Sequence, residues 1–324
     1  MLLSRGRRSS LTGAAFVAAL ASVSLFAQDV ALRYRWTAGD EVRYRNTTQS
    51  DVVMSGVPGM GDMTVGTTMV QVTKMSTDDV AADGAATVRT LYESIKMTMS
   101  SPMFTLTYDS ANPSASAGDP MMEALGKSLG LMVGESFTMV VTPAGKVLKI
   151  DGLARMLEKA KASAPEAAAA LSMAGGLEGL MGEEAQRSTI EQSFASLPAK
   201  PVKVGDTWKN ELKMPNPFGA MLASFALTLK GVEKVDGRDV ARIATTATIK
   251  PAAGAAPGAM GPMTVTMGDG TSQGEMLFDV QLGRVHKATA VVTLPMTMSM
   301  AAPDGTSISL QAATKTTTTM EIVK

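Results

Sequence analysis

The stretch Gly134–Ile150, GESFTMVVTPAGKVLKI, decides the fold that the sequence predicts. Apolar and polar residues alternate on either side of Pro143–Gly145, whose composition is typical of a tight turn. We therefore predict a β-hairpin here. A similar stretch, GEMLFDVQLGRVHKA, occurs later in the chain at Gly274–Ala288. Both stretches open with Gly-Glu and turn at a glycine followed by a basic residue and valine, so Gly145 and Gly283 are expected to have positive φ or to lie in tight turns.

Two further landmarks occur once in each half of the chain and in the same order. They are a Gly-Asp step near a tryptophan and an Asp-Gly step: Gly39-Asp40 with Trp36 and then Asp83-Gly84 in the first half, Gly205-Asp206 with Trp208 and then Asp236-Gly237 in the second. This common order predicts an internal duplication of a β-meander. The expected fold is mainly β, with two related antiparallel β-meander units, forming a curved sheet or half-barrel, joined by a helical bridge.

The sequence also predicts where these parts begin and end. The expected parts are a signal peptide at 1–27, a first β unit at 28–150, a helical bridge at 151–199 and a second β unit at 200–324. The first unit should open with a half-buried strand, because Leu32, Tyr34 and Trp36 share one parity. In the bridge, Leu153 and Met156 follow an aspartate at helical spacing, which favours a capped helix.

The first 27 residues have the features of an export signal. A basic segment with Arg5, Arg7 and Arg8 precedes the short apolar run Leu11–Phe26. A small residue, Ala27, follows, as at signal-peptide cleavage sites. We therefore expect cleavage near Ala27 and a periplasmic or secreted protein. General secretion and twin-arginine export are both open.

Composition excludes several classes of function. The chain has no cysteine, so disulfides and thiolate metal sites are impossible, and a single histidine, His286, cannot form a two-histidine metal site within one chain. Its 30 basic and 30 acidic residues give no electrostatic case for nucleic acid as a partner. No second long apolar run occurs, so no transmembrane segment is expected in the mature chain. The oligomeric state is open.

One catalytic motif has a literal match at Gly270–Gly274, which spells G-x-S-x-G. A nucleophile elbow needs a strand before this motif, a helix after it and a histidine partner. Here a β-like stretch follows instead. We expect no catalytic residues, no enzyme activity and no cofactor.

The stretch from Leu197 to Trp208 resembles a signature of a known family. An uncharacterised family of exported bacterial proteins, a domain of unknown function, carries Leu-Pro-x-Lys-Pro-Val-x-Val-Gly-Asp-x-Trp. The matching residues are Leu197, Pro198, Lys200, Pro201, Val202, Val204, Gly205, Asp206 and Trp208. The resemblance implies a periplasmic β-rich protein, loosely similar in outline to lipid-carrier half-barrels, and it brings no established activity.

Methionine is unusually frequent, with 26 residues against 8 phenylalanines. Alternate residues of a strand share a face, so several methionines should line up with other apolar residues. The residues predicted to form an apolar ligand-binding face are Met97, Met99, Val292, Leu294, Met296, Met298 and Met300. If no bulge intervenes, His286 lies on the same side as the last three methionines.

Three interpretations of the methionines are open. They can fill an aromatic-poor core, where the flexible thioether adapts to gaps. They can form an adaptable surface for an apolar or lipid-like ligand between sheet and helices. They can bind Cu(I) through Met296, Met298 and Met300 with His286, because thioethers suit soft metals. The predicted function is non-enzymatic binding of an apolar small molecule or lipid, with Cu(I) binding or a purely structural or interaction role as alternatives.

Overall fold

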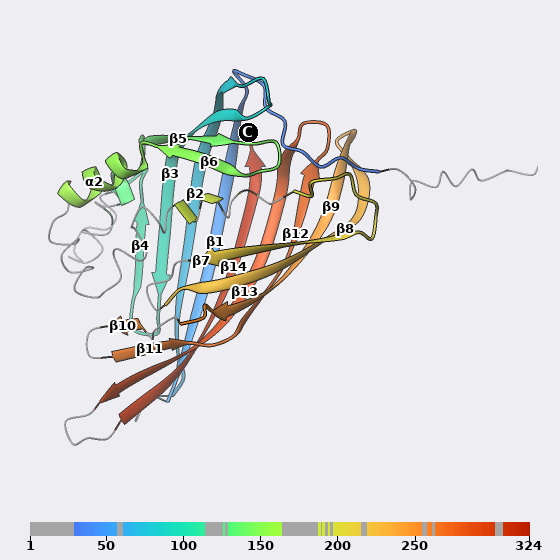
Figure 1. Ribbon diagram of the computed structural model, residues 1–324. Helices are drawn as coiled ribbons and strands as arrows, with labels where there is room; N and C mark the ends of the chain where they lie inside the picture. The colour runs from blue at the N-terminus through green and yellow to red at the C-terminus, as the bar shows by residue number, and fades with distance from the viewer. Residues whose placement is uncertain are drawn as a thin grey trace, which may run out of the picture.

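A computed structural model describes most of the chain after the first 28 residues. The described residues are 29–56, 61–113, 126, 129–163, 187–188, 190–191, 194, 197–214, 219–254, 258–260, 263–301 and 307–324. The predicted signal peptide and most of the predicted helical bridge lie outside them. A single sheet of 14 strands, all paired antiparallel, accounts for most of the structure (Figure 1). The prediction of a mainly β, antiparallel fold is confirmed.

The strands range from 3 to 18 residues, and in the described part of the chain a helix follows the last strand of the first half. The first half contains β1 (Glu41–Ser55), β2 (Met63–Val80), β3 (Ala86–Ser100), β4 (Thr105–Asp109), β5 (Ser136–Val141) and β6 (Val147–Asp151). Helix α2 (Leu153–Ser163) follows β6. The second half contains β7 (Thr207–Met214), β8 (Met221–Val235), β9 (Arg238–Pro251), β10 (Gly258–Met260), β11 (Met263–Met267), β12 (Gly270–Asp279), β13 (Arg284–Ala301) and β14 (Ser307–Val323).

The strands form an open antiparallel sheet in which the first and last strands of the chain are neighbours in the middle. Their order is β6-β5-β3-β2-β1-β14-β13-β12-β9-β8-β7, with β4 beside β3 and the β10–β11 hairpin beside β13. Most neighbours on this path are consecutive in sequence; the exceptions are β3–β5, β9–β12 and the pairing of the last strand, β14, with the first, β1. The two edges of the sheet, β6 and β7, flank α2 in sequence. Strands of both predicted units belong to this one sheet, so the structure does not separate two units.

The Gly-Asp landmarks make the same backbone contacts in both halves. The N–H of Gly39 donates to the carbonyl of Thr77 on β2, and the N–H of Thr77 donates to the carbonyl of Asp40, both at 2.9 Å. In the second half, Gly205-Asp206 makes the same pair of bonds with Leu229 on β8, at 2.8 and 3.0 Å. This recurrence is what the predicted duplication would produce.

The two predicted hairpins are β5–β6 and β12–β13, and they share a bulge. Close to each turn one residue of the returning strand has no partner, Leu148 in β6 and His286 in β13. The flanking pairs are Val141–Val147 and Val140–Lys149 in the first hairpin, and Phe278–Val285 and Leu277–Lys287 in the second. Gly145 has φ +85° and Gly283 has φ +60°, as expected. The second turn is one residue longer.

The structure differs from the sequence-based expectation in two respects, the side of β13 on which His286 lies and the equivalence of the two Gly-Glu steps. Because His286 is the extra residue of a bulge, it does not continue the row of inward-facing residues on β13; Val285, which is 4% exposed, takes the inward position. The Gly-Glu steps are not equivalent either. Gly134 has φ +82° in the turn before β5, whereas Gly274 lies inside β12 with no positive φ.

The predicted opening strand at Leu32–Trp36 is wrong in its secondary structure. Leu32 and Tyr34 are buried, as the alternation indicates, but the segment pairs with no strand of the sheet. It instead crosses the turns of both hairpins: the N–H of Tyr34 donates to Pro143 (2.7 Å) and that of Arg35 to Gly283 (3.0 Å). Because tertiary contacts supply its hydrogen bonds, an alternating pattern here produces an extended segment and not a strand.

The main core lies beneath this N-terminal segment. It joins buried residues of both halves: Leu32, Tyr34, Val88, Phe137, Val141, Val147, Leu229, Ile243 and Phe278, among others. Helix α2 contributes Leu153 and Met156, which are 2% and 3% exposed, so the predicted helical face is confirmed there. Residues near the edge β6 and near the edge β7 thus pack into one cluster, and the sheet curls around them (Figure 1).

Candidate functional site

Two cavities lie on the inner side of the curved sheet. The first cavity has a volume of about 480 Å³ and the second about 830 Å³. Four residues line both: Phe194, Val285, Thr318 and Met320. The two cavities therefore adjoin and together form an inner space along the curved sheet.

The wall of the first cavity is largely polar where the sheet forms it. Alternate residues of β1, Tyr44, Asn46 and Thr48, face the cavity. Arg43 and Arg45, on the opposite parity, face outward. The neighbouring strands continue this inner surface with hydroxyl and amide side chains: Gln71, Thr73 and Thr77 on β2, and Thr90 on β3.

Aromatic side chains close one end of the first cavity. Tyr34 stacks on Trp36 with ring centroids 5.8 Å apart and an interplanar angle of 13°. Phe194 and Phe278 meet Tyr34 edge-on at 5.6 and 5.5 Å. Such pairs add to the stability gained by burial. The cluster fixes the N-terminal segment against the sheet and places the indole of Trp36 in the cavity wall.

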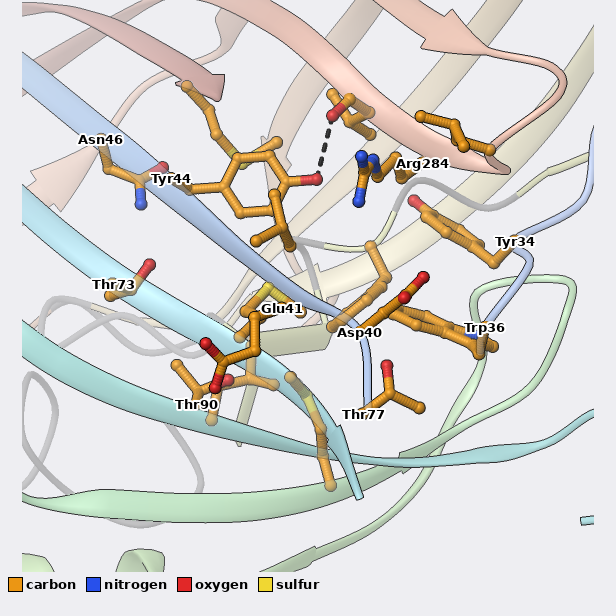
Figure 2. Close-up of a pocket in the computed structure, with 18 of the residues that line it drawn as sticks. Tyr34, Trp36, Asp40, Glu41, Tyr44, Asn46, Thr73, Thr77, Thr90 and Arg284 are labelled. Atoms are coloured by element: carbon orange, nitrogen blue, oxygen red, sulfur yellow. Dashed lines mark hydrogen bonds between the residues drawn. The ribbon is translucent and has the colours of Figure 1, made fainter. Parts of the chain in front are cut away.

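Three buried polar atoms of the described residues lack a hydrogen-bond partner, and all three belong to this wall. They are Trp36 Nε1, Thr90 Oγ1 and Arg284 Nε. Figure 2 shows these residues among those that line the cavity, on three different elements of the chain. Arg284 also makes no ion pair with any residue that the structure describes. A buried polar group without a partner is costly, so this concentration in one wall requires an explanation.

Two buried tyrosines complete the first cavity. The hydroxyl of Tyr44 donates to the carbonyl oxygen of Val285 at 2.9 Å (Figure 2). Burial raises the pKa of Tyr44 well above its usual range, against the smaller opposing effect of the Arg284 charge. Burial also raises the pKa of Tyr92 to about 12. Both phenols are therefore neutral at physiological pH.

The second cavity has a mostly apolar wall formed by the second half of the sheet. Its apolar lining residues include Met214, Met221, Phe225, Leu227, Ile249, Met276, Ala288, Ala290, Val292 and Leu294. The turn of the β5–β6 hairpin and Leu197 cover it from the other side. Polar residues such as Asn210, Ser272 and Glu275 also line it, so both cavities have a mostly apolar surface with polar groups set into it.

The structure places the predicted ligand-binding residues in three different surroundings. Val292 and Leu294 line the second cavity. Met296 and Met298 continue the same strand and line neither cavity; like Val292 and Leu294, they pack against the core cluster that contains Val265 and Met267 of β11.

The remaining predicted residues lie elsewhere. Met300 lies on β13 opposite Met263 of β11. Met97, 7% exposed, is buried beside Tyr108, and Met99 is half-buried on the same strand, β3. Apart from Val292 and Leu294, none of the predicted residues is among those that line the two cavities. Other methionines line them: Met69, Met75, Met139, Met214, Met221, Met276 and Met320.

The alternative metal site is not assembled. His286 and Met296 lie ten residues apart on the continuous strand β13, which separates them by about 33 Å at about 3.3 Å per residue. They cannot bind one ion. Within the described residues, no group of three or more histidine, aspartate or glutamate side chains is placed to hold a metal. Cu(I) binding by the three methionines alone stays a prediction.

The G-x-S-x-G match lies inside strand β12, which pairs with β9 and β13. The strand continues through the motif to Asp279, so the strand–turn–helix geometry of a nucleophile elbow is not formed. Ser272 is 7% exposed and lines the second cavity.

Sequence reasoning missed the polar wall. The N-terminal segment and Arg284 are brought to the first cavity by contacts between distant parts of the chain, which no local pattern indicates. The alternation of Tyr44, Asn46 and Thr48 was a usable signal, because it indicates a strand with a polar inner face.

Comparisons with known proteins give a family but no function. No curated protein matches the sequence. Among solved structures, lipovitellin, in a structure titled for its lipid–protein interactions, has a TM-score of 0.44 at 9% identity over 90% of this chain and 26% of that chain. This chain therefore spans about a quarter of the lipovitellin chain. A putative outer membrane lipoprotein-sorting protein domain from Vibrio parahaemolyticus has a TM-score of 0.12 at 11% identity, over 83% of each chain. With these TM-scores, neither similarity supports an argument about function.

In the part of the chain that the structure describes, no helix has the length and hydropathy needed to span a bilayer.

The match of the sequence to a family model gives a firmer result. The model of the family described as "Family of unknown function (DUF6263)" matches residues 83–285, which is more than half of the chain. The expectation of a family of unknown function is confirmed, while the signature between Leu197 and Trp208 stays a prediction. The chain belongs to the DUF6263 family.

Proposed function

We propose that this protein is an exported, non-enzymatic binding protein that holds an apolar or lipid-like ligand inside its curved sheet. The observation that carries the proposal is the inner space along the curved sheet, with cavities of about 480 and 830 Å³ that adjoin at Phe194 and Val285. Ligand pockets usually have volumes of about 300–1,000 Å³ and predominantly apolar walls. The second cavity has both properties.

A cavity of this size is not the ordinary result of core packing. Protein interiors are packed as densely as organic crystals, and voids larger than a water molecule are few. Here the sheet contributes small side chains, Ala288 and Ala290, at the centre of the second cavity wall. Methionines such as Met221 and Met276 surround them, and their flexible thioethers can adapt to ligands of different shape.

Export is part of the proposal. The basic segment, the short apolar run and Ala27 support cleavage of a signal peptide and a periplasmic or secreted location. N-terminal sequencing of the exported protein should find Gln28 or a near neighbour first. Retention of residues 1–20 in the mature protein would contradict it.

The proposal can be tested by filling the second cavity. Ala290 lines it on β13, so Ala290→Trp should occupy the space and weaken binding of an uncharged apolar probe such as N-phenyl-1-naphthylamine. Ala313 on β14 is exposed, and alternate parity places it on the outer face. Ala313→Trp therefore introduces the same side chain into the same sheet without entering the cavity, and it is the matched control.

Probe fluorescence titrations of the two variants and the parent decide the outcome. The proposal expects saturable binding by the parent and by Ala313→Trp, and a loss of roughly tenfold or more in affinity for Ala290→Trp, equivalent to about 1.4 kcal/mol. Unfolding curves should show that both variants fold. Absence of saturable binding by the parent, or equal affinity of the two variants, would overturn the proposal.

A further inference from the structure

We infer that the ligand is an amphiphile with an anionic head, a carboxylate or a phosphate, whose head binds in the first cavity beside Arg284 while its apolar chain extends into the second. This inference rests on the proposed function. It adds the chemical class of the ligand and its direction in the cavity.

The charges of the first cavity leave one cation without a counter-charge. Four of its lining residues are charged. Glu41 is neutralised by Lys74, whose Nζ lies 3.0 Å from Glu41 Oε1. Arg35 and Asp40 are exposed and of opposite sign. Arg284 is half-buried, and its charge is balanced by no residue that the structure describes.

The carboxylate that faces Arg284 across the sheet register is already occupied. Asp279 lies opposite Arg284 where β12 and β13 meet the turn. Its carboxylate is bonded instead to Arg238, at 2.6 Å, and to the N–H groups of Gln281 and Leu282. A guanidinium that is partly removed from water gains most from a carboxylate or phosphate, whose oxygens match its planar set of donors. Within the described residues no carboxylate forms an ion pair with Arg284, and a ligand can supply such a group.

The other unpartnered groups of the wall favour the same chemistry. An indole N–H and a guanidinium can only donate hydrogen bonds, and a threonine hydroxyl can donate or accept. Trp36 Nε1 and Arg284 Nε are covered in this structure and without acceptors, and Thr90 Oγ1 is also unpartnered. Among the three unpartnered groups, which Figure 2 labels in one wall, donors are therefore in excess. The ligand group that satisfies them must accept hydrogen bonds.

The two cavities differ in the way that an amphiphile requires. Threonine, asparagine and glutamine side chains of β1, β2 and β3 surround the first, whereas methionine, leucine, isoleucine and alanine dominate the second. Val285, the residue after Arg284, lines both. An apolar chain that starts beside Arg284 therefore needs to pass only the residues that line both cavities to reach the larger one.

Four probes with the same sixteen-carbon chain separate the head from the tail. They are palmitate, hexadecyl phosphate, hexadecanol and hexadecyltrimethylammonium, each used below micelle-forming concentrations in displacement of N-phenyl-1-naphthylamine. In the parent protein, at least one anion should bind roughly tenfold or more tightly than hexadecanol, because a hydrogen bond to a charged group adds that much. The cation should bind most weakly. The order of the two anions tells whether the head is a carboxylate or a phosphate.

Substitution of Arg284 tests the assigned residue. Arg284→Gln removes the charge and keeps a similar length, so the affinity for the anions should fall to that for hexadecanol, which itself should not change. Arg284→Lys should keep part of the preference, because it retains the charge but loses the planar fork. Arg45→Gln is the control, since Arg45 lies exposed on β1, 3.6 Å from Glu321. It should leave all four affinities unchanged.

The outcomes distinguish this inference from the proposed function. Equal affinity of the parent for hexadecanol and both anions would overturn the anionic head, as would an Arg284→Gln protein that keeps the preference. Failure of all four probes to bind the parent would overturn the proposed function instead. If Arg284→Gln does not fold, the affinities of the parent and of Arg284→Lys for the four probes still test whether the head is anionic.

Discussion

The two halves of the sheet have the same turns but different inner surfaces. Gly39-Asp40 and Gly205-Asp206 make matching backbone bonds, and the two hairpins share a bulge at Leu148 and His286. The inner face of β1–β3 nevertheless carries hydroxyl and amide groups among its apolar residues, whereas methionine, leucine and alanine are more frequent on that of β8, β12 and β13. The comparison shows that one backbone arrangement can support two chemistries, because the inward-facing positions of each strand are free to differ.

The halves also differ in their place in the sheet. The first hairpin ends at the edge β6, where Leu148 is 50% exposed. The second hairpin lies inside the sheet, because β14 continues beyond β13 and pairs with β1. Both turns contact the N-terminal segment, but only the second also lies between paired strands of the sheet interior, so a substitution there should be more damaging than one at the edge.

The largest effect is expected for Gly283→Ala. Gly283 has φ +60°, and an added Cβ would lie 2.4 Å from the backbone nitrogen of Arg35. Gly205→Ala is the control, since its φ is +97° but nothing lies within 4 Å of an added Cβ. The positive φ alone should cost about 1–2 kcal/mol in Gly205→Ala. Displacement of the N-terminal segment should raise the cost in Gly283→Ala to about 3–4 kcal/mol. Equal costs in urea unfolding would contradict the contact.

The second prediction concerns the free energy of unfolding at alkaline pH. It involves only the first half of the chain, which contains all four tyrosines, Tyr34, Tyr44, Tyr92 and Tyr108. Burial raises the pKa of Tyr92 to about 12, while a tyrosine in the unfolded chain ionises near pH 10. The unfolded state therefore loses its proton first. The stabilising contribution is complete below about pH 10 and is lost as the pH rises towards about 12, amounting to about 2–3 kcal/mol. Tyr92→Phe should reduce this loss in urea unfolding at pH 9 and 11.5, and an unchanged loss would contradict the assignment.

Sequence reasoning found the elements that depend on local pattern. The β-hairpins, the glycines with positive φ and the helical face of Leu153 and Met156 were all predicted correctly. Each depends on alternation, turn composition or helical spacing within a few residues. The pairing of β14 with β1 and the path of residues 30–37 across both turns depend on contacts between distant segments, which such patterns do not specify.

Of the residues predicted to bind a ligand, only Val292 and Leu294 line a cavity. Val292 and Leu294 share a parity with Met296 and Met298, so the sequence could not tell which part of β13 faces open space and which part faces another strand. The β10–β11 hairpin decides this, because β11 pairs with β13 from Met296 to Met300. Likewise, the bulge at His286 changes the parity before Lys287, and nothing in the residues marks it.

A third, smaller effect compares the residues that support the two turns. Asp279, 2% exposed, accepts hydrogen bonds from two backbone N–H groups and from Arg238. Thr142, at the start of the first turn, accepts one, from the N–H of Lys146 at 3.1 Å. We expect Asp279→Ala to cost about 2 kcal/mol and Thr142→Ala about 0.5–1 kcal/mol, because more buried donors lose their partner in the first case. A larger cost for Thr142→Ala in urea unfolding would reverse the comparison of the turns.

A further prediction, for Met298→Ala, separates the residues that line the second cavity from the methionines beside it. Met298 is half-buried and lies opposite Val265, which is 0% exposed. Removal of a fully buried methionine side chain costs about 2–5 kcal/mol, so this half-buried one should cost about 1–2 kcal/mol in urea unfolding. Binding of the uncharged probe should not change, because Met298 lines neither cavity.

The same strand tests the copper alternative. A ligand that binds only the folded state raises its stability, so Cu(I) held by thioethers should stabilise the parent and not a variant in which Met296, Met298 and Met300 are all serine. We expect equal unfolding midpoints with and without Cu(I) for the parent, because the structure packs Met296 and Met298 against apolar side chains. A Cu(I)-dependent rise in the parent that the triple variant lacks would make this stretch of β13 a metal site. A change in probe affinity in Met298→Ala would instead extend the ligand cavity towards β11.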